Sequence, residues 1–305
     1  MRGQGLLLAL SAACTIPAGV AVAQVAGGTG APKGGITMAD AGGGQKVRYG
    51  KEVAIGGFVS PRAGGAPVSL EYAPRGRAFK TVAAAVTGAD GSYRFNVKAR
   101  RSGSYRALAK GTSAVTAARS VTVVARLAGR SRRHLLGGRP VRVRGRLLPR
   151  LRGRRIRLQV KTSRGWRTAA RTRTRSGGRF KASFRPRRPG VYRLRVRFPG
   201  DVAAAAATDR LRRVYVYRPG QASWYGPGFY GNSTACGGAL TAGRLGVANR
   251  YLPCGTRVTF RYRGRSVTVP VIDRGPFAAG RDWDLTAATK QRLGFGDVGV
   301  VWSTR

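Results

Sequence analysis

Acidic residues are scarce in this 305-residue chain, which holds 10 Asp and Glu against 58 Lys and Arg. It has one histidine, His134, and three cysteines, so a structural zinc site with four His or Cys ligands has few residues to draw on. No run of eighteen apolar residues follows the amino terminus, so no transmembrane segment is expected in the mature chain. We expect no metal or cofactor, and we interpret His134 as an exposed linker residue.

What is abundant favours β structure. The chain contains 46 Gly and 15 Pro, and 42% of its residues are hydrophobic. This composition suits turn-rich β domains with real cores better than long helices. The length allows two or three such domains.

The amino terminus has the pattern of an export signal. Residues 1–23 carry a basic Arg2, an apolar run from Leu6 and a small-residue cleavage site. An alternative is lipid anchoring at Cys14, although Ser11 stands where a lipoprotein signal has a Leu-like residue. Either way, we expect a secreted, extracytoplasmic protein of the cell wall or periplasm.

The two remaining cysteines, Cys236 and Cys254, lie close together in the sequence. In an exported protein they most simply form one disulfide, which would contribute about 3 kcal/mol by closing so short a loop. Zinc is the competing interpretation, but His134 lies about a hundred residues upstream and no other histidine exists.

The middle of the chain repeats itself. Gly57 recurs as Gly145 and Gly91 as Gly178, at offsets of 145 − 57 = 88 and 178 − 91 = 87 residues. A period near 90 is the size of an immunoglobulin-like β-sandwich and too long for a solenoid repeat. Gly91 and Gly178 fall where tight turns would join strands.

We therefore predict two tandem immunoglobulin-like β-sandwiches, at residues 34–126 and 127–217. Alternating apolar and basic residues, as in 192–197, predict strands with one buried face. The pattern resembles the immunoglobulin-like modules that bacterial surface proteins carry in tandem.

The second repeat is extremely basic. Residues 130–218 hold 28 Arg and 2 Lys against only Asp201 and Asp209. The arginines either fill solvated strand positions or form an attachment surface for an anionic wall polymer or lipid head group. Nucleic acid is not expected as a partner, because no nucleic-acid-binding motif accompanies the charge.

Residues 218–305 read as a third domain of short strands with one helix. The helical pattern covers 286–293, with Thr286 as its N-cap and Gly294 as its end. The expected strands are 222–225, 256–262, 265–272 and 298–302. Three aspartates, Asp273, Asp282 and Asp284, gather within twelve residues of this acid-poor chain.

Several motifs in this third domain occur in a recognisable order. They are Ala-Ser-Trp-Tyr-Gly at 222–226, Thr-Ala at 234–235, Leu-Pro-Cys-Gly-Thr at 252–256, Asp-Arg-Gly-Pro-Phe at 273–277 and Asp-Leu-Thr at 284–286. As a set they resemble the rare lipoprotein A (RlpA-like) double-psi β-barrel, a relative of expansins and barwins. The resemblance implies a six-stranded barrel with one short helix, so the whole chain is expected to be all-β.

The resemblance implies that the domain acts on peptidoglycan as a lytic transglycosylase. Such an enzyme cuts between N-acetylmuramic acid and N-acetylglucosamine without water, through a carboxyl that first donates and then accepts a proton. Asp273 matches the family's catalytic aspartate, and Asp284 matches an aspartate that expansins require. The expected substrate-binding residues are Trp224, Tyr225, Thr234, Arg274 and Phe277.

One position departs from the pattern: Gly238 stands where many family members carry a glutamate implicated in catalysis. The alternative function is therefore a non-catalytic, expansin-like module that binds or loosens peptidoglycan. Structural roles are also open to the aspartates, since Asp273 could form the turn at 275–276 and Asp284 could support the helix start. Asp282 is expected to be exposed and incidental.

Overall fold

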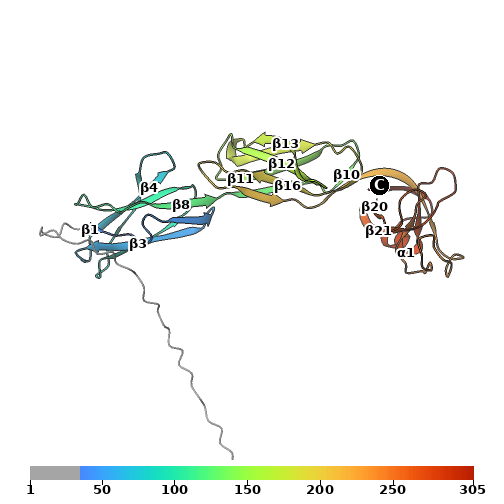
Figure 1. The fold of residues 1–305 in the computed structure, drawn as a ribbon, viewed down its shortest axis with the longest axis horizontal. Coiled ribbons are helices and arrows are strands. Elements are labelled where there is room, and N and C mark those ends of the chain that lie inside the picture. Colours follow the sequence, from blue (N-terminus) through green and yellow to red (C-terminus); the bar gives the residue numbers. More distant parts are fainter. Residues whose placement is uncertain (1–34) are drawn as a thin grey trace, which may run out of the picture. The chain divides into compact units, whose positions relative to one another are not determined.

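The computed structural model describes residues 35–305 (Figure 1). The predicted signal at 1–23 and the lipidation candidate Cys14 lie outside this range. The described chain is all-β, with one α-helix, α1 (Ala287–Leu293), and one 3-10 turn, η1 (Ser176–Gly178). Within residues 35–305, no helix is long and apolar enough to cross a membrane.

The first repeat consists of two sheets around one core. One sheet has the order β1 (Gly35–Ile36), β3 (Glu52–Ser60), β6 (Ser92–Lys98). The other has the order β2 (Gly44–Arg48), β8 (Arg119–Val124), β7 (Gly103–Ala109), β4 (Pro67–Pro74), β5 (Lys80–Val86). Both contribute to one buried cluster, which includes Ile55, Phe95, Leu70 and Val123.

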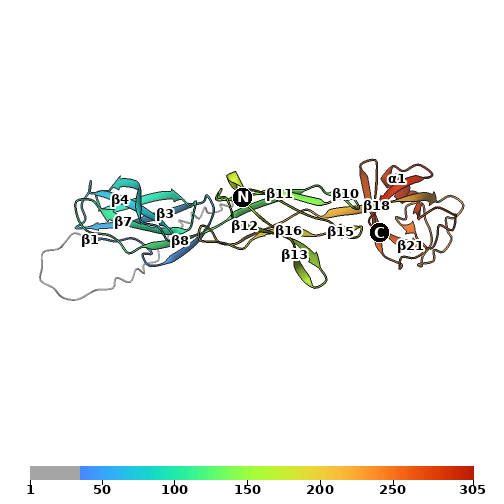
Figure 2. The ribbon, with the colours of Figure 1, turned by 90° about the horizontal axis from the view of Figure 1, so that it is seen from above.

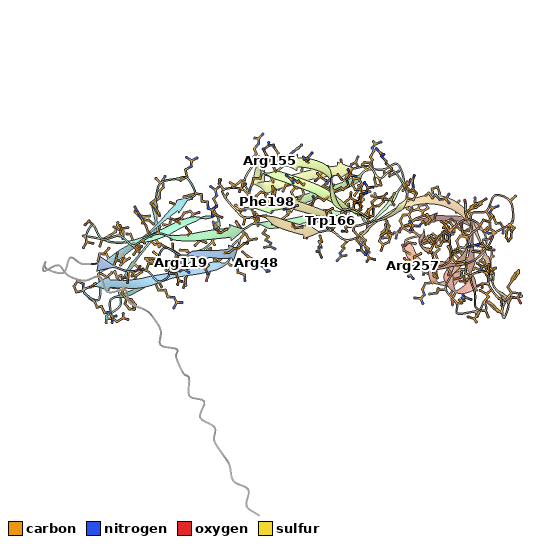
Figure 3. The ribbon with its side chains drawn as sticks, in the orientation of Figure 1. Arg48, Arg119, Arg155, Trp166, Phe198 and Arg257 are labelled. Atoms are coloured by element: carbon orange, nitrogen blue, oxygen red, sulfur yellow. A yellow bond between two sulfur atoms is a disulfide. The ribbon has the colours of Figure 1, made fainter. Side chains whose placement is uncertain are left out.

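The second repeat is built in the same way. Its sheets run β14 (Arg179–Phe184), β11 (Val141–Leu148), β9 (Arg126–Ser131) and β13 (Gly165–Arg173), β12 (Arg155–Thr162), β16 (Leu194–Phe198), β17 (Ala207–Arg210). Leu147, Phe180, Leu158 and Phe198 belong to the core between them. Figure 3 labels Phe198, whose ring lies 4.3 Å from the Arg154 guanidinium carbon.

The internal repeat is visible in the strand register. Gly56 of β3 pairs with Arg94 of β6, and the corresponding Arg144 of β11 pairs with Lys181 of β14. Gly91 and Gly178 have φ of +74° and +69°, which confirms the two predicted turns. The immunoglobulin-like class and the boundary at 126/127 stay predictions.

His134 corrects one expectation. It lies in strand β10 (His134–Leu136), half-buried, and is no exposed linker residue. Its ring stacks on Tyr215 and Tyr217, and Nδ1 is 2.8 Å from the Tyr217 hydroxyl. β10 and β15 (Gly190–Tyr192) flank the first part of β18 (Val214–Tyr225), as Figure 2 shows. Strand pairing and aromatic stacking explain why this residue is not free in solvent.

The carboxy-terminal domain is a closed barrel of six strands. The cycle runs β18, β22 (Trp283–Thr286), β19 (Val247–Ala248), β21 (Arg265–Asp273), β20 (Arg257–Tyr262), β23 (Gly299–Ser303) and back to β18. Trp283 and Phe260 are fully buried inside it, with their rings edge to face at 5.0 Å. β18 continues through residues 217 and 218, so the predicted domain boundary falls within a strand.

Two local predictions in the barrel are confirmed. β20 and β21 form a hairpin in which Arg263 and Gly264 both have positive φ, as a tight two-residue turn requires. Helix α1 begins after Thr286, whose hydroxyl accepts a hydrogen bond from the Thr289 N–H, and ends at the left-handed Gly294.

Candidate active site

Barrel register brings the two predicted catalytic aspartates onto one row. Ser223 of β18 pairs with Asp284 of β22, Asp284 pairs with Ala248 of β19, and Ala248 pairs with Asp273 of β21. The aspartates are thus two strands apart, about 10 Å at the backbone, with a methyl side chain between them.

A groove of about 390 Å³ lies over this row. Both aspartates line it, together with residues from the loops after β18 and β21. The other lining residues include Ser223, Tyr225, Phe229, Asn232, Thr234, Arg274, Phe277 and Arg281. Phe229 and Phe277 are 54% and 80% exposed, so they offer apolar ring faces at the groove.

The Asp273 carboxylate is held at one oxygen. Its Oδ1 accepts hydrogen bonds from the backbone N–H groups of Ala235 at 2.9 Å and Arg274 at 2.8 Å. The Asp273 carbonyl accepts a third from the Asn249 N–H. These bonds fix the direction of the carboxylate toward the groove, and they give Asp273 the turn-forming role that the sequence left open as well.

Asp284 is in a different environment. Burial raises the pKa of its carboxyl, and the Asp273 carboxylate adds to this, while Ser223 and the Arg281 charge oppose it. Burial also raises the pKa of the Tyr225 hydroxyl, with further contributions from the charges of Asp273 and Asp284. Asp284 therefore holds a proton more readily than a free aspartate does.

Unpaired polar atoms cluster in this groove. Across the described residues, four buried side-chain atoms have no hydrogen-bond partner: Ser223 Oγ, Tyr225 OH, Asp284 Oδ1 and Trp283 Nε1. The first three belong to groove residues. Ser223 also acts on the Asp284 carboxyl and Tyr225 on the Asp273 carboxyl, so these hydroxyl groups lie beside the two aspartates and can bond either to them or to a ligand.

Arg274 positions the groove wall and does not point its charge at the carboxylates. Its guanidinium donates to the Leu252 carbonyl at 3.1 Å and contacts the Asn249 carbonyl and Cys254 Sγ. Asn249 in turn caps the backbone N–H groups of Tyr251 and Leu252. This network anchors the loop after β19 to the strand that carries Asp273.

The predicted disulfide is present. Cys236 and Cys254 are bonded, with their Cα atoms 5.5 Å apart. The Cys236 N–H donates to the Ile272 carbonyl, directly before Asp273. The crosslink therefore holds the loop that donates the Ala235 N–H to the carboxylate.

The remaining predicted residues separate into two groups. Tyr225, Thr234 and Phe277 reach the groove, although the Thr234 hydroxyl donates to the Gly237 carbonyl within its own turn. Trp224 is not among the groove-lining residues. Its Nε1 donates to Asp297, and Lys290 lies 3.7 Å from its ring centroid. Neighbouring strand residues point to opposite faces, so Trp224 and Tyr225 do not share one surface.

The sequence analysis did not predict several groove residues, among them Ser223 and Phe229. Ser223 precedes Trp224 in the expected strand, and its alternation with Tyr225 was the signal that could have found it. Phe229 lies in a glycine-rich loop without periodicity, so no sequence pattern marked it. Asp282 corrects an expectation: it is half-buried rather than exposed, and it lies apart from the groove, where its Oδ2 accepts a hydrogen bond from the Gln221 N–H at 3.0 Å.

Gly238 occupies a turn that suits glycine. Its φ is +75°, and a Cβ at this position would lie 3.2 Å from Nη1 of Arg244. That guanidinium donates to the carbonyls of Gly237 and Ala239. Arg244 thus stabilises the backbone of the turn in which many family members carry glutamate.

Comparison with known proteins shows what this barrel is similar to. Residues 218–302 match the family described as lytic transglycolase. The carboxy-terminal domain is RlpA-like. A probable endolytic peptidoglycan transglycosylase RlpA from Synechocystis is 46% identical over 102 residues, 33% of this chain and 32% of that protein. The endolytic peptidoglycan transglycosylase RlpA of Neisseria meningitidis is 42% identical over 101 residues, 32% of this chain and 42% of that protein.

The family match covers residues 218–302, and each of these relatives matches about a third of this chain. The chain spans less than half the length of these relatives. Among solved structures, the Streptomyces papain inhibitor is 26% identical with a TM-score of 0.24, covering 29% of this chain and 94% of that one.

Proposed function

We propose that the RlpA-like domain binds peptidoglycan glycan strands in its groove and cleaves them as a lytic transglycosylase. The observation that carries the proposal is the row Ser223–Asp284–Ala248–Asp273, which presents two carboxyl groups and the Ser223 hydroxyl group to one groove. The relatives' names support peptidoglycan as the substrate and the wall as the location.

The chemistry requires two proton transfers. A carboxylic acid protonates the glycosidic oxygen as its bond to C1 of the muramoyl ring breaks, and the 6-hydroxyl of that ring then bonds to C1 and loses its proton. Asp284 is the proton donor, because burial raises its pKa. Asp273 accepts the hydroxyl proton, because two N–H bonds orient its carboxylate toward the groove. A proton then returns from Asp273 to Asp284.

This division of roles differs from the sequence-based hypothesis, which gave both transfers to Asp273. Substrate binding is assigned to the ring faces of Phe229 and Phe277 and to the hydroxyl groups of Ser223 and Tyr225. Sugar rings carry apolar faces that pack on aromatic side chains, and their hydroxyl groups would complete the unpaired hydrogen bonds.

The competing function is glycan binding without cleavage, which the absence of a glutamate at Gly238 favours. Mass spectrometry of purified peptidoglycan incubated with the full chain distinguishes the two. Cleavage gives anhydromuramoyl ends. Wild-type protein that pellets with peptidoglycan at high concentration and yields no such ends would establish the binding function instead.

Two variants test the catalytic pair. Asp273→Asn and Asp284→Asn should each stay folded, keep pelleting with glycan and lose at least about 100-fold in cleavage rate. Asp282→Asn, which changes an aspartate outside the groove lining, should cleave at the wild-type rate. Wild-type cleavage by Asp284→Asn would return both transfers to Asp273, and wild-type cleavage by Asp273→Asn would remove that residue from the mechanism.

A further inference from the structure

The outer face of the sheet β14–β11–β9 gathers cations in a regular array. On β11, Arg142, Arg144 and Arg146 alternate with inward-facing residues and are exposed. Arg144 is paired with Arg130 on one side and Lys181 on the other, and Arg146 is paired with Arg179. These six residues, Arg130, Arg142, Arg144, Arg146, Arg179 and Lys181, are called the cationic face below.

The protein supplies no counter-charge to this face. In the part of the chain that the structure describes, none of the six residues takes part in an ion pair. Asp201 of the same repeat binds Arg154 through both oxygens, and Asp209 accepts a hydrogen bond from the Gly129 N–H. Like charges directly opposite one another destabilise a sheet, so the array opposes folding.

The first repeat shows that the fold does not require these cations. The residues equivalent to Arg142, Arg144 and Arg146 in β3 are Ala54, Gly56 and Phe58. Those equivalent to Arg179 and Lys181 in β6 are Ser92 and Arg94. The same strand pairs in the same register therefore carry one cation in the first repeat and five in the second. The first repeat therefore lacks this array, whereas the other sheet of the second repeat carries exposed arginines as well.

The cationic face is also hollowed. A hollow of about 850 Å³ is lined by Arg130, Arg144, Arg146, Arg179 and Lys181. A second hollow of about 600 Å³ shares Arg130 and Arg144 with it and extends past Arg142. The two adjoin, so together they form a trough bordered by cations. Figure 3 shows the side chains that project from the strands of this repeat.

The trough lacks the aromatic platforms on which bases stack. Its one aromatic lining residue, Phe180, is 1% exposed. Proteins that bind single-stranded nucleic acid combine a basic groove with exposed aromatic rings, whereas this trough offers charge alone. Its chemistry suits a chain that presents phosphates at intervals and carries no bases.

We propose that the cationic face binds a linear phosphodiester polymer of the cell wall, with its phosphates in the trough. This inference goes beyond the proposed cleavage and rests on it only for the compartment. The trough would attach the protein to the wall while the RlpA-like domain acts on glycan.

The test measures binding of purified poly(glycerol phosphate) to the full chain by fluorescence anisotropy at several NaCl concentrations. Neutralising about six cations should give a slope of log affinity against log salt near −4. The fourfold variant Arg142→Gln, Arg144→Gln, Arg146→Gln, Arg179→Gln should bind about 100-fold more weakly, with a slope near −1.5. It should melt no lower than wild type, because it removes like-charge pairs.

A matched control removes the same charge from the other sheet of this repeat. Arg155, Arg167, Arg171 and Arg173 are exposed on β12 and β13, and changing all four to Gln should weaken binding less than about 5-fold. Equal losses in the two variants would mean that net charge alone binds the polymer, and would overturn the proposal. Tighter binding of an oligodeoxyadenylate of equal charge would replace it with nucleic acid. Glycan cleavage should be unchanged in both variants, which separates this test from that of the catalytic pair.

Discussion

Two aspartates on one row of the barrel differ in what surrounds them. Asp273 accepts two backbone N–H bonds at one oxygen, whereas Asp284 Oδ1 is buried without a partner. The sequence marked both residues, because three aspartates in twelve residues stand out in a chain with 10 acids. It did not indicate their different environments, because these depend on strand register and on which loops cover each carboxyl.

The raised pKa of the Asp284 carboxyl predicts how the stability of the protein depends on pH. When the pKa of a carboxyl is higher in the folded state than in the unfolded state, protonation of that carboxyl favours folding. This stabilisation is complete below the unfolded-state pKa, and it is lost as the pH rises through the folded-state pKa. Asp284→Asn should therefore raise the melting temperature at pH 7, and the gain should shrink toward pH 3.5. Thermal melts of both proteins across this range provide the measurement. A gain that is the same at every pH would contradict the assignment.

Arg274 provides a second prediction at this scale. Its Nη1 donates to the carbonyls of Asn249 and Leu252 while its Nη2 contacts Cys254 Sγ, a fork that a single ammonium nitrogen cannot reproduce. We expect Arg274→Lys to lower the free energy of unfolding by about 1–3 kcal/mol, because carbonyls lose their donors. Chemical denaturation measures this, with Arg257→Lys, at an exposed position on β20, as the control. Equal stability of the two variants would leave Arg274 without its positioning role.

At the scale of elements, the disulfide joins two loops that build the groove. It joins Cys236 and Cys254, which are 18 positions apart in the sequence, and lies beside the Ala235 N–H that binds Asp273. Replacing both cysteines by alanine should cost about 3 kcal/mol of stability. Cleavage should fall further than stability alone explains, because Asp273 loses a fixed donor.

The disulfide prediction has two readouts. Thiol labelling of the native, unreduced chain should find neither Cys236 nor Cys254 free. Denaturation of the double alanine variant should show the loss of stability. Full labelling of both thiols in the native protein would contradict the crosslink, and an unchanged cleavage rate in the folded variant would remove its role in positioning the groove.

Elements with a strong local signal were predictable. The hairpin of β20 and β21 follows from alternation around an Arg-Gly turn, and α1 follows from a capping threonine and a terminal glycine. Only the family resemblance predicted that the barrel is closed. β18 pairs in parallel with β22 and antiparallel with β23, and such distant pairings leave no periodic trace in one sequence. The sequence analysis predicted that both Trp224 and Tyr225 line the groove. Only the observed orientation of the strand shows which of these two neighbouring aromatic residues faces it.

At the scale of the whole molecule, the densest arginine array and the candidate cleavage groove belong to different domains. The chain carries a formal net charge of +48, and the second repeat holds 27 arginines against two aspartates. The groove of the RlpA-like domain instead combines two aspartates with exposed phenylalanine rings. Salt screens exposed charges but leaves contacts between sugar faces and aromatic rings largely intact. Attachment to the wall and action on glycan should therefore respond differently to ionic strength.

The last prediction uses this difference. Pelleting of the full chain with intact walls should fall at least about 10-fold as NaCl rises from about 0.05 to 0.5 M, where the screening length is about 4 Å. Cleavage of short, soluble glycan fragments should change little over the same range, because the fragments enter the groove without attachment through the repeat. Co-sedimentation measures the first quantity and mass spectrometry of anhydromuramoyl ends the second. If pelleting persists at high salt, the arginines only face solvent and the groove alone holds the wall; if both quantities fall together, substrate binding in the groove is itself electrostatic.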